Sequence, residues 1–168
     1  NFHAQTEFVV GSSPQTVVVA DVNGDGLLDL ITANQSSYNA SVLLGNGDGT
    51  FQAATTFAVG TTPAALVAGD FNGDTELDLA TANSDSDDVS ILLNNGSGGF
   101  APATSVVVGD NPIALVAGDL NGGGIDRPHA ENAARAVGHA QAEGIWRRGD
   151  RRRARCADDQ RHAGRAGR

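Results

Sequence analysis

Acidic side chains recur at alternate positions of a short turn in this sequence of 168 residues. The turn carries Asp21, Asn23 and Asp25 at its positions 1, 3 and 5, and Asp29 at position 9. Calcium takes about 6–8 oxygen ligands, and side chains that alternate along a tight turn can converge on one ion. The carbonyl oxygen of Leu27 at position 7 would add another ligand. The turn therefore predicts a calcium site.

A second turn of the same kind starts at Asp70. Thr75 replaces the glycine found at position 6 of the first turn, and glycine is the residue that most easily adopts the positive φ of a sharp turn. We therefore expect the second turn to bind calcium more weakly than the first. Its expected ligands are the residues at positions 1, 3, 5, 7 and 9, namely Asp70, Asn72, Asp74, Glu76 and Asp78.

A third turn begins at Asp119 and is incomplete. Asn121 keeps position 3, but Gly123 occupies position 5, and the last acid, Asp126, comes one place early. A missing carboxylate weakens the attraction for a divalent cation. We therefore expect Asp119 and Asn121 to contribute only to a weak third site.

Two other interpretations of the acidic turns compete with a calcium loop between strands. An EF-hand also begins with acids at positions 1, 3 and 5, but it needs Glu at position 12 and flanking helices. Position 12 of the first turn is Thr32 and its flanks are strand-like, so the EF-hand is excluded. Asn-Gly and Asp-Gly pairs also form ordinary hairpin turns. That simpler interpretation stays open, although a turn alone does not need four oxygen donors in register.

Other polar segments are expected to have structural roles. The segments 46–49 and 94–98 each lie between two expected strands, where a hairpin loop belongs. Asp85, Asp87 and Asp88 fall in a connection between strands and are expected to be solvated charges.

The acidic turns belong to a repeat with a period of 49 residues. Three landmarks, a glycine, a proline and the first acid of the turn, keep this spacing twice: Gly11, Gly60 and Gly109; Pro14, Pro63 and Pro112; Asp21, Asp70 and Asp119. Phe2, Phe51 and Phe100 keep it as well and are expected to pack between repeats. Each period holds four short β-rich runs separated by Gly, Asn and Asp turns. The expected strands cover residues 16–20, 28–33, 40–44 and 53–59, then 65–69, 77–82, 89–93 and 103–108.

Four antiparallel strands in roughly 40–50 residues are typical of a β-propeller blade, so the sequence predicts an all-β fold. Residues 1–11 align with residues 50–60. Residues 1–126 are therefore expected to hold the last strand of one blade, two full blades and the start of a third. A propeller closes with about 4–8 blades. We therefore expect an incomplete propeller fragment whose exposed blade faces can self-associate.

Residues 1 to about 125 resemble the FG-GAP (VCBS) repeat family, the blades of integrin-α-like propellers and of many secreted bacterial proteins. The acidic turns, the period, and the segments LLGNGDGTF and LLNNGSGGFAPAT carry the resemblance. It implies a propeller whose acidic loops bind calcium. It also implies a location outside the cell or at its surface, although no secretion signal is present at Asn1.

The charge of the chain is divided between two segments. Residues 1–126 contain 15 Asp and Glu but no Lys or Arg, while all 11 Arg residues lie at or after Arg127. An acidic body repels nucleic acid and anionic membranes, and no apolar run approaches the roughly 18 residues of a membrane span. Neither nucleic-acid binding nor membrane insertion is expected. The one cysteine, Cys156, excludes a disulfide framework.

The segment 127–168 breaks the repeat inside the third blade. It has no Leu or Phe and is rich in Arg, Ala, Gly and His. Such a composition is poorly suited to strands. The segment is interpreted either as a disordered basic tail or, as we favour, as an out-of-frame translation of a GC-rich gene.

Three functions fit these features, and catalysis fits least. Before Arg127 the chain offers His3 and Tyr38 but no Lys, Arg or Cys for acid–base or nucleophilic chemistry, so an enzyme is not expected. A polysaccharide-cleaving propeller would need a carboxylate pair, but repeated turns already account for most of the Asp residues. We expect a calcium-binding module for extracellular adhesion or for binding a protein or glycan ligand. The alternative is a passive scaffold within a larger secreted protein.

Overall fold

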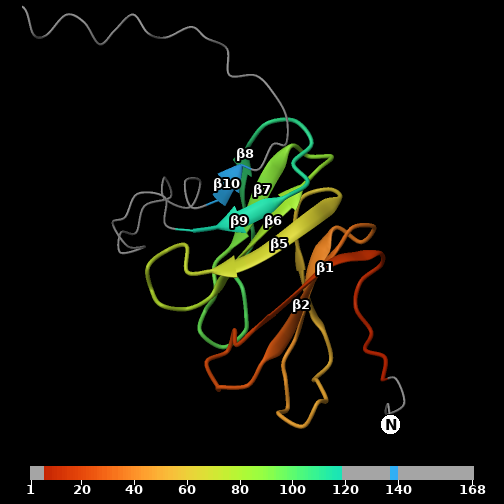
Figure 1. The fold of residues 1–168 in the computed structure, drawn as a ribbon, viewed down its shortest axis with the longest axis vertical. Helices are drawn as coiled ribbons and strands as arrows, with labels where there is room; N and C mark the ends of the chain where they lie inside the picture. The colour runs from red at the N-terminus through yellow and green to blue at the C-terminus, as the bar shows by residue number, and fades with distance from the viewer. Residues whose placement is uncertain (1–5, 119–136, 140–168) are drawn as a thin grey trace, which may run out of the picture.

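Two antiparallel β-sheets make up most of the computed structural model, which describes residues 6–118 and 137–139 (Figure 1). No helix occurs among these described residues. Each sheet has four strands in sequential order, so strands that are neighbours along the chain pair with each other. The first sheet consists of β1 (Pro14–Ala20), β2 (Asp29–Asn34), β3 (Asn39–Leu43) and β4 (Thr55–Ala58). The second consists of β5 (Pro63–Gly69), β6 (Asp78–Asn83), β7 (Asp88–Leu92) and β8 (Thr104–Val107).

The two sheets are two copies of one blade, which confirms the predicted all-β fold. Their strands fall on the expected runs, with ends that differ by one or two residues for most of them. β1 and β5 each begin at a proline, and the pairing with the next strand shifts directly after it. The shift follows because Pro14 and Pro63 have no N–H to donate to the ladder.

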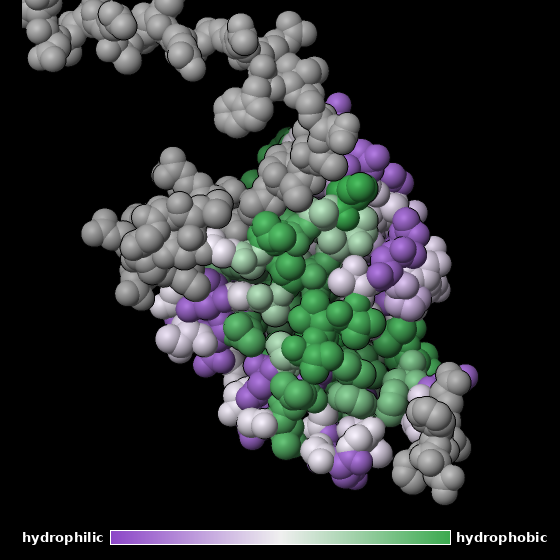
Figure 2. All heavy atoms as spheres, viewed as in Figure 1, coloured by the Kyte–Doolittle hydropathy of each residue, from purple (hydrophilic) through white to green (hydrophobic). Residues whose placement is uncertain are grey.

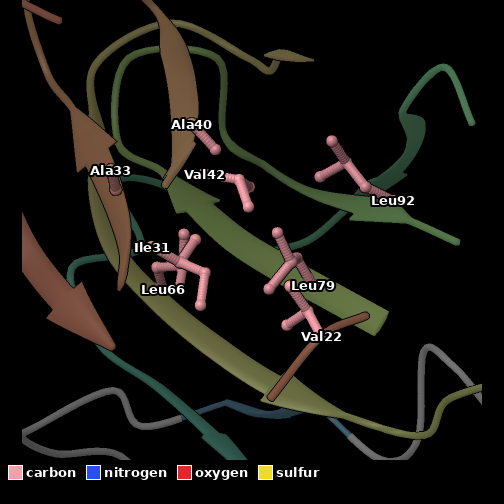
Figure 3. Packing of buried hydrophobic residues seen from close by; sticks show 8 residues of the cluster. All are labelled: Val22, Ile31, Ala33, Ala40, Val42, Leu66, Leu79 and Leu92. Atoms are coloured by element: carbon pink, nitrogen blue, oxygen red, sulfur yellow. The ribbon is translucent and has the colours of Figure 1, made fainter. Parts of the chain in front are cut away.

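The core lies between the two sheets. Ile31, Ala33, Ala40 and Val42 of the first sheet face Leu66, Leu79 and Leu92 of the second, and Val22 from the first acidic loop joins them (Figure 3). All eight side chains are at most 3% exposed. The facing residues alternate with residues of the opposite face along each strand, as the two-residue period of a β-strand requires. Small residues on β2 and β3 let the sheets approach closely.

Aromatic pairs close the outer side of this packing. Phe57 of β4 makes an edge-to-face contact with Phe100, with the ring centroids 5.2 Å apart. Phe8 and Phe51, both 49 residues earlier, make the same contact at 5.1 Å. The expected packing role of Phe51 and Phe100 is confirmed for these two contacts.

The first strands of successive repeats lie side by side. The hydroxyl of Thr16 on β1 donates to the carbonyl of Ala64 on β5 at 3.1 Å. β9 (Leu115–Ala117) begins a third sheet on the other side of β5 (Figure 1). A second core cluster of Phe71, Ala80, Val89 and Ile91 separates β9 from the second sheet, and Leu115 packs against it.

β9 pairs with β10 (Val137–His139), which belongs to the basic segment. This short strand lies in a segment whose composition is poorly suited to strands. Strand pairing uses backbone N–H and C=O groups, which every residue except proline supplies, so an open strand edge can pair with a segment of low β propensity.

In each sheet, a buried polar network fixes the turn between the second and third strands. Asn34 donates to Asn39 Oδ1 and to Ser41 Oγ, both at 2.8 Å. Asn83 does the same in the second sheet, to Asp88 Oδ1 at 2.8 Å and Ser90 Oγ at 2.9 Å. Each network lies so close to a glycine that a side chain there would clash with it. A Cβ on Gly60 would lie 2.6 Å from Asp88 Oδ1.

The expectation that Asp88 is a solvated charge is therefore wrong. Asp88 is 9% exposed and accepts hydrogen bonds from Asn83, Ser86 and Ser105. Burial raises its pKa, but these three hydrogen bonds to the charged form outweigh burial, so the pKa lies below its ordinary value. Asp85 also has a partner, since it accepts a hydrogen bond of 2.6 Å from the hydroxyl of Thr62.

Apolar side chains gather on the face of the molecule that carries β1, β5 and β9 (Figure 2). Val17 and Val19 of β1, at one end of this row of strands, and Val116 of β9, at the other end, are each more than half exposed. Among the described residues, no helix has the length and apolar character needed to cross a membrane.

Candidate metal centre

The two complete acidic turns form equivalent loops at the same end of the two sheets. One loop connects β1 to β2, and the other connects β5 to β6. Both loops expose their position-5 carboxylates, Asp25 and Asp74, and bury their position-9 carboxylates, Asp29 and Asp78, at 0% exposure. Each loop therefore has an exposed carboxylate at its tip and a buried carboxylate where the next strand begins.

Asp21 organises the first loop from its position 1. Its Oδ1 accepts the N–H of Gly24 and its Oδ2 accepts the N–H of Gly26, both at 2.8 Å. Both glycines have positive φ, at 72° and 82°, which lets the chain curl around the carboxylate. The two bonds hold the backbone of the loop against one carboxylate.

Asn23 and Asp25 extend the same pattern towards the tip of the loop. Asn23 Oδ1 accepts the N–H of Asp25 at 3.1 Å, and Asp25 Oδ1 accepts the N–H of Leu27 at 2.8 Å. The amide of Asn23 donates to Asp25 Oδ2 at 2.9 Å. The side-chain oxygens at positions 1, 3 and 5 thus each accept a backbone N–H group of the same loop.

Asp29 anchors the loop to its sheet. Its Oδ2 accepts the N–H of Val22 at 2.9 Å, which closes the loop on itself. Its Oδ1 accepts the N–H of Gly45, directly after β3, at 2.8 Å. A Cβ at residue 45 would lie 2.3 Å from the carbonyl oxygen of Leu28, so glycine is needed for this close approach.

The second loop repeats this network bond for bond. Asp70 accepts the N–H groups of Gly73 and Thr75, at 2.7 and 2.9 Å. The remaining bonds pair Asn72 with Asp74, Asp74 with Glu76, Asp78 with Phe71, and Asp78 with Asn94, all between 2.8 and 2.9 Å. Thr75 adopts a φ of 76°, close to the 82° of Gly26, although it is β-branched. The loop keeps its shape at the cost of local backbone strain.

Asp78 is in an unfavourable electrostatic position. Burial raises its pKa above its ordinary value, and the nearby charges of Asp74 and Asp70 raise it further. The N–H groups of Asn94 and Phe71 oppose this by stabilising the charged form.

A family comparison accounts for both loops. The family model described as FG-GAP-like repeat matches residues 21–81 and 70–126, which together are more than half of the chain. The chain belongs to the FG-GAP-like repeat family. Each match begins at the first acid of a loop, Asp21 or Asp70, so both loops lie within the matched residues. No curated protein matches the chain.

The donor set of the FG-GAP-like repeats suits a hard cation. Each loop supplies carboxylate and amide oxygens without any nitrogen or sulfur ligand, which is the chemistry of calcium sites. No Lys or Arg lies before Arg127 to neutralise these acids. In the described part of the chain, however, no three acidic, His or Cys side chains converge in a metal-holding arrangement, because the carboxylates accept backbone N–H groups instead.

Position 7 of each loop leans towards a neighbouring hairpin. Leu27 lies against Gly47, and Glu76 lies against Gly96, as the space around these glycines shows. The side chain of Glu76 therefore lies beside the neighbouring hairpin, as the side chain of Leu27 does in the first loop. The expected third site, Asp119 and Asn121, lies outside the described residues.

The hairpin loops between the third and fourth strands are structural, as the sequence indicates. Asp48 accepts hydrogen bonds from the hydroxyl and the N–H of Thr50, which lower its pKa. Asn95 Oδ1 accepts the N–H groups of Ser97 and Gly99 in the equivalent loop. Both side chains hold their own hairpin.

Sequence reasoning missed Asn94. Its amide donates to the carbonyl of Val22 at 2.7 Å and to the carbonyl of Leu77 at 2.9 Å. Asn94 is 8% exposed and touches both acidic loops. The one sequence feature that could have identified it is the break in the repeat, since the equivalent residue 49 positions earlier is Gly45.

Proposed function

We propose that this chain is a non-catalytic, calcium-binding module of β-propeller blades that presents a binding surface outside the cell. The observation that carries the proposal is the pair of acidic loops. Two loops in consecutive FG-GAP-like repeats keep the same oxygen donors, in the same register and with the same hydrogen bonds. Ordinary turns do not require such agreement at four polar positions.

The loop residues would hold the ion through side chains and one carbonyl. In the first loop these are Asp21, Asn23, Asp25 and Asp29 with the carbonyl of Leu27, and in the second they are Asp70, Asn72, Asp74 and Asp78 with the carbonyl of Glu76. Calcium would supply the positive charge that the acidic body lacks. The side-chain oxygens at positions 1, 3 and 5 each retain lone pairs beside the N–H group that they accept, so they could also bind an ion.

Ligand specificity is assigned to the turns between the second and third strands of each blade. The first is Gln35–Tyr38 and the second is Ser84–Asp87, so they differ in charge while their frame is the same. A hydrogen bond from Asn34 to Asn39 fixes the first turn, and one from Asn83 to Asp88 fixes the second. Variable loops on a rigid scaffold are the usual location of recognition residues, and a protein or glycan is the class of ligand we propose.

Calorimetric titration of calcium tests the first part of this proposal. We expect two ions per chain for the wild type, one for each complete loop, and none for the double variant Asp25→Ala, Asp74→Ala. Asp48→Ala is the matched control, since it removes an exposed Asp from a hairpin loop outside both acidic loops and should leave binding unchanged.

The binding of ligands is tested separately, with and without a chelator. The wild type should bind at least one member of a glycan array or one extracellular-matrix protein in the presence of calcium. Calcium binding without any ligand would favour a passive scaffold. No heat of calcium binding in the wild type would contradict the calcium assignment itself.

A further inference from the structure

Asn94 is the one described side chain that hydrogen-bonds to both acidic loops. Its two amide hydrogens go to the carbonyls of Val22 in the first loop and Leu77 in the second. Its own N–H donates to Asp78 Oδ1 at 2.8 Å, and its Oδ1 accepts the N–H of Gly96 at 3.0 Å. With 8% exposure, Asn94 is held in one orientation.

Val22 is the part of the first loop that Asn94 holds. It stands between two expected calcium ligands, Asp21 and Asn23. Its N–H donates to Asp29, its carbonyl accepts from Asn94, and its side chain is 1% exposed in the core between the sheets. Any change in the path of the first loop therefore moves a backbone group to which Asn94 is bound.

Leu77 and Asp78 are the corresponding part of the second loop. They occupy positions 8 and 9, and Asn94 binds one through its side chain and the other through its backbone. The position-9 carboxylate is the anchor of the loop, because it also accepts the N–H of Phe71. Asn94 thus connects the start of one loop to the end of the next.

The first sheet has no such connection. Gly45 stands where Asn94 would be and keeps only the backbone bond, from its N–H to Asp29. Both repeats therefore have the bond from this backbone N–H to the position-9 carboxylate. Only the second repeat adds the side-chain bonds that connect the two loops.

We propose that Asn94 couples calcium binding at the two loops, so that an ion in one loop raises the affinity of the other. This inference rests on the proposed function. An ion in the first loop would fix the peptide groups around Val22, and Asn94 would pass that restraint to Leu77 and Asp78. The second loop would then lose less conformational freedom when it binds its own ion.

The test is a double-variant cycle read at the second loop alone. The amide NMR signals of Gly73 and Thr75 report calcium in that loop, because both N–H groups donate to Asp70. Asp21→Ala disables the first loop. In the wild-type background this change should weaken calcium binding at the second loop by about fivefold or more, the usual size of coupling between sites. In the Asn94→Gly background it should change the affinity by less than twofold.

Asn95→Gly is the matched control, because it removes the neighbouring amide, which binds only within its hairpin. The effect of Asp21→Ala should remain about fivefold in this control. An equal effect of Asp21→Ala with and without Asn94, or no effect in the wild type, overturns the coupling while leaving the proposed function intact. If the wild type binds no calcium, the proposed function itself is wrong. The same NMR spectra show whether Asn94→Gly is folded, and Asn94→Ser replaces it in the cycle if it is not.

Discussion

Thr75 is the residue at which the two acidic loops differ most in backbone energy. Its φ of 76° is strained for a β-branched side chain, whereas Gly26 adopts 82° without strain. Thr75→Gly should therefore stabilise the protein by about 1 kcal/mol, after allowance for the greater freedom of glycine in the unfolded chain. Denaturant unfolding without calcium measures the difference.

The reverse change in the first loop is the control. A Cβ at Gly26 would meet no atom within 4 Å, so Gly26→Thr introduces backbone strain without a steric clash. It should destabilise the protein by about the same 1 kcal/mol. Equal stability of both variants and the wild type would show that the loop relaxes to a different backbone conformation.

The turn between β6 and β7 contains an ionised carboxylate where the turn between β2 and β3 contains an amide. Asp88 and Asn39 occupy equivalent positions and both accept a hydrogen bond from the preceding asparagine. The pKa of Asp88 is lowered in the fold. A lowered carboxyl pKa adds stability above the unfolded pKa, and this stability is lost as the pH falls through the folded pKa.

The variant Asp88→Asn should therefore be less stable than the wild type at pH 7 and should match it in strongly acidic solution. Thermal unfolding between pH 7 and pH 2 measures this, and the advantage of the wild type should shrink below the ordinary Asp pKa of 3.8. The partners of Asp88, namely Asn83, Ser86 and Ser105, do not titrate in this range, so they add no competing change. A difference that does not vary with pH would exclude a charged Asp88 as its cause.

The whole molecule leaves one blade face open. Val17 on β1 is 59% exposed, while Leu66, its equivalent on β5, is 3% exposed because the first sheet covers it. A groove of about 520 Å³ lies between the segment at Phe8 and the first sheet at Leu43.

We expect a second copy of the chain to cover this face with the opposite end of the molecule, where Ile113 and Val116 are 65% and 57% exposed. Such a head-to-tail contact joins two different surfaces, so further copies can add to the free ends and association should grow with concentration. Sedimentation should show oligomers of the wild type and a monomer for Val17→Asp, Val19→Asp.

Tyr38→Asp is the control for this prediction, since Tyr38 is 48% exposed on the turn between β2 and β3. It should leave the oligomers intact. Oligomers of unchanged size in the double Val variant would place the contact elsewhere.

The repeat, the strands and the acidic turns could be predicted from the sequence. These features depend on residues close together in the chain, such as the alternation along β2 or the Asn-Gly pair after Val22, and local preferences determine them. The repeat also made these predictions more secure, because a residue type that recurs after 49 residues is expected to have the same role in both repeats.

The tertiary structure alone decided which polar residues are buried and which loops touch. Asp88 lies in a connection by its sequence, but the hydroxyl of Ser105 and the amide of Asn83 enclose it. Asn94 bridges two loops through a bond to a residue 72 positions away. The Asp88 contacts arise only when three strands of one sheet pair, and the Asn94 contact arises only when two sheets pack face to face. The pattern within one repeat contains no information about its neighbour's backbone. The sequence thus determined the acidic loops, and the packing of the sheets decided how they are connected.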